Sequence, residues 1–142
     1  MFFWFVATAV FTVFYVFRDP GFDYRLLMVG SLIPLASVRV LHSVLFGVAL
    51  LTVLMLAFRR GARRRMLLGL PIGVLLHLVF TGAWTDQNVF WWPLFGWGLD
   101  GAQHPVAARG WWNVPLELAG VVGCWLIARR IDWRSGRITR LP

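Results

Sequence analysis

The chain has 142 residues, of which 59% are hydrophobic and only 14% are charged. A soluble domain is about 45–50% apolar and about 25% charged, so this chain lacks the polar residues that would cover a globule in water. The composition therefore excludes an ordinary soluble domain and predicts a single domain whose main solvent is lipid.

All fourteen basic residues are arginines, and the formal net charge is +8. In a soluble chain such a charge would indicate a nucleic-acid partner. Most of these arginines instead follow apolar runs directly, which is where cytoplasmic loops of membrane proteins carry positive charge. We therefore expect no nucleic-acid partner, and anionic lipid headgroups as the counter-charge. The two blocks are Arg59, Arg60, Arg63, Arg64 and Arg65, and Arg129, Arg130, Arg134, Arg137 and Arg140.

Four apolar runs have about the length of a membrane-spanning helix. In chain order they are residues 2–17, 40–58, 66–84 and 111–128. Residues 26–38 are also apolar, but this segment is short and contains Gly30 and Pro34, so it fits a re-entrant segment as well as a crossing helix. The sequence predicts an all-α, polytopic transmembrane helical bundle with four spans plus a re-entrant segment, or with five spans.

The connections between these runs predict the orientation. Residues 85–110 are rich in Trp and Phe, which favour the headgroup level, so we expect an outer aromatic loop there. The loop at residues 59–65 and the basic tail at residues 129–142 are expected in the cytoplasm. The N-terminus then lies outside if residues 26–38 cross the membrane, and inside if they re-enter.

Small residues in two runs predict close helix packing. Gly69 and Gly73 are four residues apart, and Gly120, Gly123 and Cys124 cluster in the last run. Such small residues allow helix backbones to approach each other in a membrane. Cys124 is the single cysteine, so no disulfide forms within the chain.

Ionisable residues inside apolar runs are the candidates for chemistry, since each is costly in a membrane. His42, His77 and Glu117 qualify, and Asp86 lies just beyond the third span. A helical rise of about 1.5 Å per residue places the first three at similar depths in the outer half. Two imidazoles and a carboxylate are ligand types for a divalent metal such as zinc. Asp86 or Glu117 would then act as the catalytic base for a metal-bound water.

A structural interpretation of the same residues stays open. A histidine within the membrane often forms a hydrogen bond between helices, and Glu117 can cap a neighbouring helix without binding metal. The two histidines also lack the H-E-x-x-H spacing of known zinc helices. The residues alone therefore leave a metal site and a structural role as alternatives.

Short motifs between about residues 20 and 95 resemble those of a bacterial family. The family consists of small inner-membrane proteins described as membrane-bound metal-dependent hydrolases, and the resemblance is strongest to its actinobacterial branch. The motifs are Asp23-Tyr24-Arg25, Gly30-Ser31-Leu32-Ile33-Pro34, His42-Ser43, Leu76-His77-Leu78, Trp84-Thr85-Asp86 and Phe90-Trp91-Trp92-Pro93.

The resemblance implies a bacterial cytoplasmic (inner) membrane location, with His42 and His77 as metal ligands and Asp86 as their companion. The family usually carries acidic residues where this chain has Leu35 and Thr81. Losing both removes most of the negative charge of such a site. We therefore expect a non-catalytic accessory or lipid-binding subunit, with membrane lipids and a protein partner or second copy as its contacts. The alternative is a metal-dependent hydrolase of a lipid or lipid-linked phosphoester at the outer leaflet.

Overall fold

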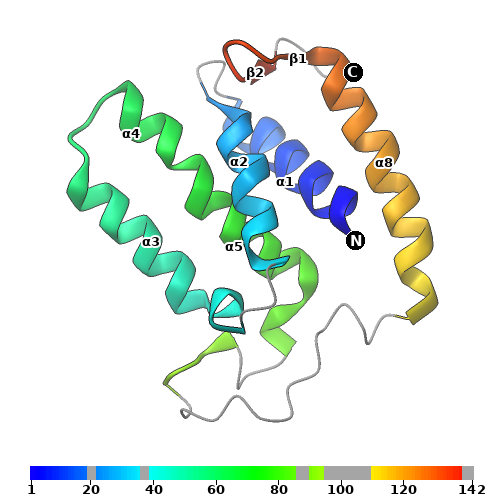
Figure 1. Ribbon diagram of the computed structural model, residues 1–142, viewed down its shortest axis with the longest axis horizontal. Coiled ribbons are helices and arrows are strands. Elements are labelled where there is room, and N and C mark those ends of the chain that lie inside the picture. The colour runs from blue at the N-terminus through cyan, green and yellow to red at the C-terminus, as the bar shows by residue number, and fades with distance from the viewer. Residues whose placement is uncertain (19–21, 36–38, 86–89, 95–109, 139–142) are drawn as a thin grey trace.

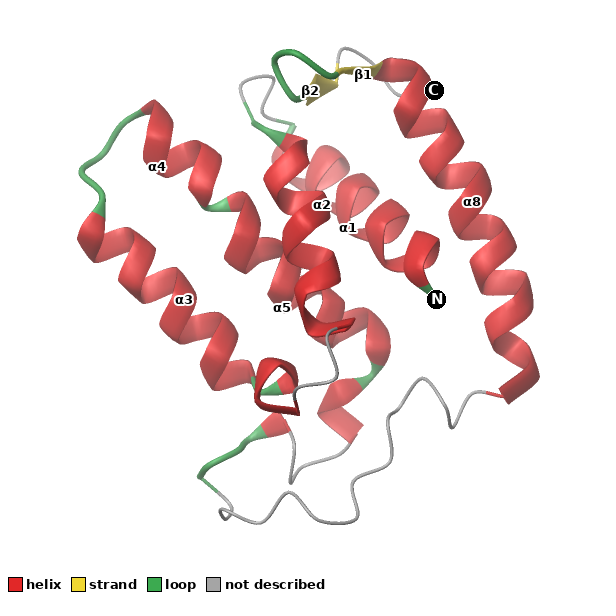
Figure 2. Ribbon diagram, in the orientation of Figure 1, coloured by secondary structure: helices red, strands yellow, loops and turns green. Residues whose placement is uncertain are grey.

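The described part of the protein is mostly helical (Figure 2). The computed structural model describes residues 1–18, 22–35, 39–85, 90–94 and 110–138. The longer helices are α1 (Phe2–Phe17), α2 (Tyr24–Leu32), α3 (Val44–Ala57), α4 (Ala62–Leu67), α5 (Gly69–Thr81) and α8 (Asn113–Arg130). Short 3-10 helices are η1 (Ile33–Leu35), η2 (Arg39–His42), η3 (Ala83–Thr85) and η4 (Gly110–Trp112). Strands in the described residues are limited to the hairpin of β1 (Ile131–Asp132) and β2 (Arg137–Ile138).

Two helical stretches are long and apolar enough to cross a membrane, Ala62–Thr81 and Gly110–Arg130. Shorter apolar helices cover Phe2–Phe17, Tyr24–Leu35 and Val44–Ala57. The all-α prediction is thus confirmed, and every predicted apolar run contains a helix. The number of helices that would cross a bilayer depends on how the protein is placed in the membrane.

The helices pack in the order α3, α5, α2, α1 and α8 across the molecule (Figure 1). Consecutive apolar segments alternate in direction in this view. α1 ends at the edge that carries the hairpin, α2 runs away from it, α3 returns, α4 and α5 run away, and α8 returns. The expected segment at residues 26–38 therefore includes most of α2, which runs antiparallel to α1. The helical structure continues from α2 through η1 as far as Leu35.

Glycines set the two closest helix contacts, as the small-residue pattern predicts. A Cβ on Gly73 would lie 2.6 Å from the backbone nitrogen of Ser31, so α2 and α5 touch through their backbones. A Cβ on Gly123 would lie 2.8 Å from the Cβ of Ala7, where α8 meets α1. Because no larger side chain fits, these glycines hold the helix pairs together at short distance.

Several boundaries differ from the sequence expectation for local reasons. α3 begins at Val44 because the Ser43 hydroxyl accepts a hydrogen bond from the backbone N–H of Leu45, which caps the helix. His42 therefore lies in a 3-10 turn before the helix and not within it. α5 ends at Thr81 because Gly82 adopts a left-handed conformation with φ of 73°, a common way to end a helix.

Candidate functional site

The structure brings His42 and His77 together. Their rings lie edge to face with centroids 5.9 Å apart. His77 projects from the middle of α5 and is only 2% exposed, with the Phe5 ring of α1 at 4.2 Å. The two histidines, which the sequence analysis placed at similar depths, are therefore neighbours, and their role as metal ligands stays a prediction.

His77 links two helices through its ring. Its Nδ1 lies 2.6 Å from the carbonyl oxygen of Ser31 on α2. Because a carbonyl can only accept, the ring proton sits on Nδ1, and Nε2 keeps its lone pair. Histidines that bind metals are oriented in this way, but so are histidines that tie helices together in a membrane.

The described residues do not complete a metal centre around this pair. A catalytic zinc needs three protein ligands. In the described part of the chain, no three His, Cys, Asp or Glu side chains lie close enough together to hold one metal ion. The predicted companion Asp86 lies outside the described residues. Thr81, where the resembling family has an acid, is buried and its hydroxyl donates to the carbonyl of His77 on its own helix.

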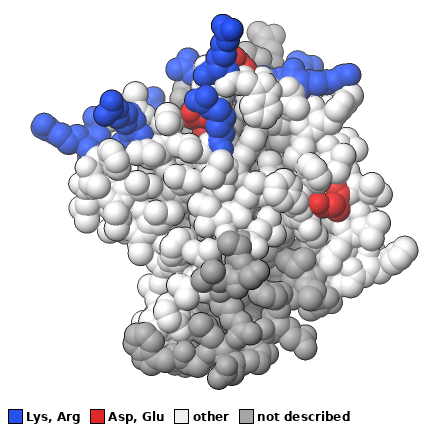
Figure 3. Space-filling model, in the orientation of Figure 1, with Lys and Arg blue, Asp and Glu red and all other residues white. Residues whose placement is uncertain are grey.

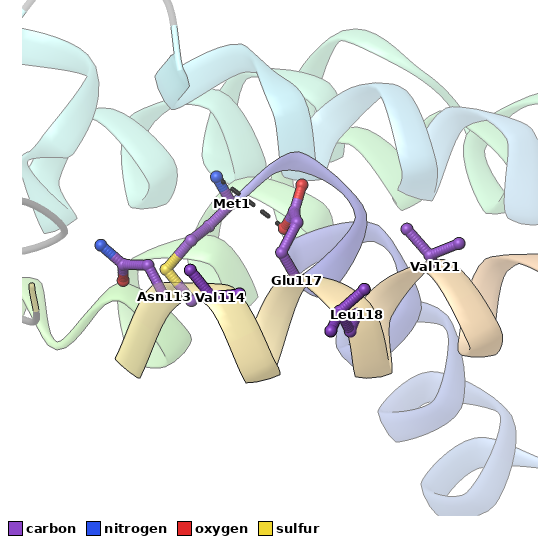
Figure 4. A pocket seen from close by; sticks show the side chains of 6 residues that line it. All are labelled: Met1, Asn113, Val114, Glu117, Leu118 and Val121. Atoms are coloured by element: carbon purple, nitrogen blue, oxygen red, sulfur yellow. Dashed lines mark ion pairs between the residues drawn. The ribbon is translucent and has the colours of Figure 1, made fainter. Parts of the chain in front are cut away.

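Glu117 caps a neighbouring helix and does not join the histidines as the predicted base. Its Oε1 accepts hydrogen bonds from the backbone N–H groups of Phe2 and Phe3, at 2.8 and 3.2 Å. Its Oε2 accepts from Trp4 at 3.4 Å and lies 3.8 Å from the Met1 ammonium nitrogen. Figure 4 shows the carboxylate turned toward Met1 across a pocket of 410 Å³ between α1 and α8.

The sequence carries a signal for this cap, although it is an indirect one. The first turn of α1 has no acidic residue, and its N-cap residue makes no side-chain hydrogen bond. The first N–H groups of a helix carry a partial positive charge and need acceptors. Glu117 supplies these acceptors from α8. The start of α1, which lacks a cap of its own, therefore explains why an acidic residue lies within the apolar run of α8.

An apolar groove lies between α1, α2 and α8, with a cavity of 280 Å³. Figure 1 shows α2 and α8 on either side, with α1 behind them. Its lining is apolar throughout and includes Phe3, Val6, Met28, Leu32, Cys124 and Ile127. Trp133, from the hairpin, closes the lining at the end where the chain leaves α8. The sequence did not predict this groove, because its residues come from segments far apart in the chain.

The predicted basic tail is folded onto the helices over most of its length. Ile131 and Ile138 pair across the hairpin and are both buried in the core with Leu27. Gly136 has a positive φ of 68°, and its carbonyl accepts a hydrogen bond from Tyr24 at 2.8 Å. The tail is thus part of the domain, which corrects the expectation of a simple extension.

Asp23 and Arg25 hold the hairpin against the start of α2. Asp23 is 6% exposed, binds the Arg25 guanidinium at 2.7 Å and accepts from the Arg25 backbone N–H. Arg25 Nη1 donates to the carbonyls of Trp133 and Arg134 in the hairpin. The hydrogen bond from Arg25 lowers the pKa of the Asp23 carboxyl below its ordinary value of 3.8. Asp23 therefore has a structural role at the start of α2.

Arginines gather along one edge of the molecule (Figure 3). This edge carries the hairpin and the turn between α3 and α4, so the two predicted blocks lie at the same end of the fold. The helix faces below it are apolar and exposed, with Leu56 of α3 at 83% and Leu118 of α8 at 64%. Charge and apolar surface are thus separated along the helix axes.

Comparison of the chain with protein-family models, with curated proteins and with solved structures finds no match. The resemblance to membrane-bound hydrolases accordingly stays a prediction.

Proposed function

We propose that the protein is a non-catalytic lipid-binding subunit of the bacterial inner membrane, with an acyl chain of a phospholipid in the groove between α1, α2 and α8. The observation that carries this proposal is the groove itself, which is lined by apolar residues and extends to Trp133 in the hairpin between β1 and β2. An acyl chain fits the lining, and arginines next to Ala128 on α8 suit an anionic headgroup.

The polar residues that suggested an enzyme have structural partners, which supports a non-catalytic role. His77 ties α5 to α2 through the Ser31 carbonyl, and Glu117 caps α1. The site lacks the two acids of the resembling family, since Leu35 and Thr81 stand in their places. As an accessory subunit the protein would present the outer faces of α3 and α8 to lipid, to another membrane protein or to a second copy.

A five-span placement agrees best with the direction of the helices. Five apolar segments alternate between the arginine edge and the opposite end. The positive-inside rule puts the arginine edge in the cytoplasm. In this placement the C-terminus is cytoplasmic and α1 starts toward the outer side.

The orientation is tested by cysteine labelling. The Ser135→Cys substitution in a Cys124→Ala background should give a protein that reacts with a membrane-impermeant maleimide only after the cells are opened. Reaction in intact cells would contradict the orientation.

The groove is tested by filling it. Met28→Trp places a large ring among the groove residues, whereas Met55→Trp puts the same ring on the exposed face of α3. We expect native mass spectrometry to show a retained phospholipid on the wild-type protein and on the Met55→Trp variant, and its loss from Met28→Trp. Equal retention by both variants, or no retained lipid on the wild-type protein, would contradict lipid binding in the groove.

The hydrolase is the second candidate, and the pairing of His42 with His77 is what favours it. It requires a third ligand beyond the described residues, for which Asp86 is the candidate in the sequence. Elemental mass spectrometry of the purified protein is the test, with a His42→Ala/His77→Ala variant beside it. Near-stoichiometric zinc that disappears in the variant would favour the hydrolase. Absence of metal from the folded wild-type protein would exclude it.

A further inference from the structure

The turn between α3 and α4 contains a separate cavity of 310 Å³. Three arginines line it: Arg60 from the turn, and Arg64 and Arg65 from α4. Gly61 and Leu68 complete the lining. Arg59 and Arg63 belong to the same arginine block but do not line the cavity, so the block is divided between two surfaces.

The carboxylates of the described chain do not neutralise these three arginines. Asp23 is bound to Arg25, Glu117 caps α1, and Asp132 accepts from Arg134 and Ser135 in the hairpin. In the described ranges, ion pairs involve only Asp23 and Glu117. Three like charges around one cavity repel each other, and an anion placed between them relieves that repulsion.

The chemistry of the cavity selects a phosphate group in a headgroup without a cation, because three arginines repel a positive group such as choline. Guanidinium groups present planar pairs of N–H donors that match phosphate oxygens. Phe58 and Leu56 lie at the end of α3 that leads into this turn, and they form an apolar surface that is 37% and 83% exposed. A phosphate with an acyl chain attached would have its headgroup among the arginines and its chain against this surface.

We propose that Arg60, Arg64 and Arg65 form a binding site for a phosphate group, supplied by an anionic lipid of the cytoplasmic leaflet. The inference deepens the proposed function and rests on it for the membrane placement. It concerns headgroup selectivity at the α3–α4 turn, whereas the groove between α1, α2 and α8 concerns retention of an acyl chain.

The test measures headgroup preference in the full-length protein. The protein is placed in nanodiscs that contain phosphatidylglycerol and phosphatidylcholine in equal amounts. The lipids that stay bound to it on release are counted by native mass spectrometry. Arg60→Gln/Arg64→Gln/Arg65→Gln should lower the preference for phosphatidylglycerol about tenfold or more, because these three arginines line one cavity and their guanidinium groups would bind one phosphate together. The matched control, Arg59→Gln/Arg63→Gln/Arg137→Gln, removes the same charge and should keep most of the preference.

Two further arms separate the possible sources and failures. Inorganic phosphate added in excess should leave the lipid preference unchanged if the lipid is the ligand. Loss of the preference would show that free phosphate fills the site and would overturn the lipid as its source. Equal loss of preference in both triple variants, or in neither, would also overturn the proposal. Met28→Trp tests the groove independently, because it lowers total lipid retention while the site at the α3–α4 turn keeps its own preference for phosphatidylglycerol.

Discussion

At the scale of single residues, the polar groups within apolar helices act as connectors. His77 joins α5 to α2, and Glu117 joins α8 to the first turn of α1. Both satisfy backbone groups that lipid cannot hydrogen-bond. The residue types and their depth could be read from the sequence, but their partners could not. Partner choice depends on which helices are neighbours, and no local pattern encodes that.

Glu117→Ala should destabilise the protein through the start of α1. The change removes acceptors from three backbone N–H groups and a negative charge from the positive end of a helix. Loss of a cap costs about 0.5–2 kcal/mol, and we expect a value in that range here. Thermal unfolding in mild detergent would measure it. Glu117→Gln retains one acceptor oxygen, so its unfolding temperature should lie between those of the wild type and Glu117→Ala. A glutamine variant as unstable as the alanine variant would contradict capping by hydrogen bonds.

Asp23 should make hairpin docking sensitive to acid. Its pKa is lowered in the folded protein by Arg25, so the carboxylate stabilises the folded state above its ordinary pKa. This stability is lost as pH falls through the lower folded value, and docking should be constant from about pH 5 to 8. Hydrogen exchange of the hairpin amides should show increased opening only in acid. Asp23→Asn should exchange quickly at neutral pH, and a variant as protected as the wild type would contradict the clamp.

At the scale of elements, the helices follow the apolar runs because length and hydropathy determine them locally. Close packing at Gly73 and Gly123 was also foreseen from the small-residue patterns, but the partner helices α2 and α1 were not. The folded tail was missed. Its burial depends on Ile131 and Ile138 meeting α1 and α2, and two isolated isoleucines among arginines give no periodic signal.

Gly73→Ala should separate α2 from α5. The added methyl group would approach the Ser31 nitrogen within 2.6 Å, and backbone atoms cannot move aside as side chains do. Overpacking of this kind costs about 1–3 kcal/mol, so the midpoint of thermal unfolding should fall clearly. Gly61→Ala is the matched control, because its new methyl group would meet only the Arg59 carbonyl oxygen at 4.0 Å. Equal unfolding midpoints for the two variants would contradict the close contact.

At the scale of the whole molecule, the fold separates an arginine edge from apolar helix faces and leaves a groove between three helices. The separation was predictable, because each arginine block follows an apolar run. The groove was not, since α1, α2 and α8 come from opposite ends of the chain and meet only after folding. The same reason explains why the sequence alone left a metal centre open: it places His42, His77 and Glu117 at similar depths, but it does not show the structural partner of Glu117.

The most direct test of lipid binding in the groove is photo-crosslinking with a phospholipid that carries a diazirine in its acyl chain. The protein is loaded, stripped of bulk lipid by detergent exchange, irradiated and digested for mass spectrometry. We predict adducts on peptides that contain Met28, Leu32 and Ile127, with few on Val48 of α3 and Val79 of α5, which are exposed and lie away from the α3–α4 turn. Labelling of Val48 and Val79 equal to or greater than that of the groove would contradict the account.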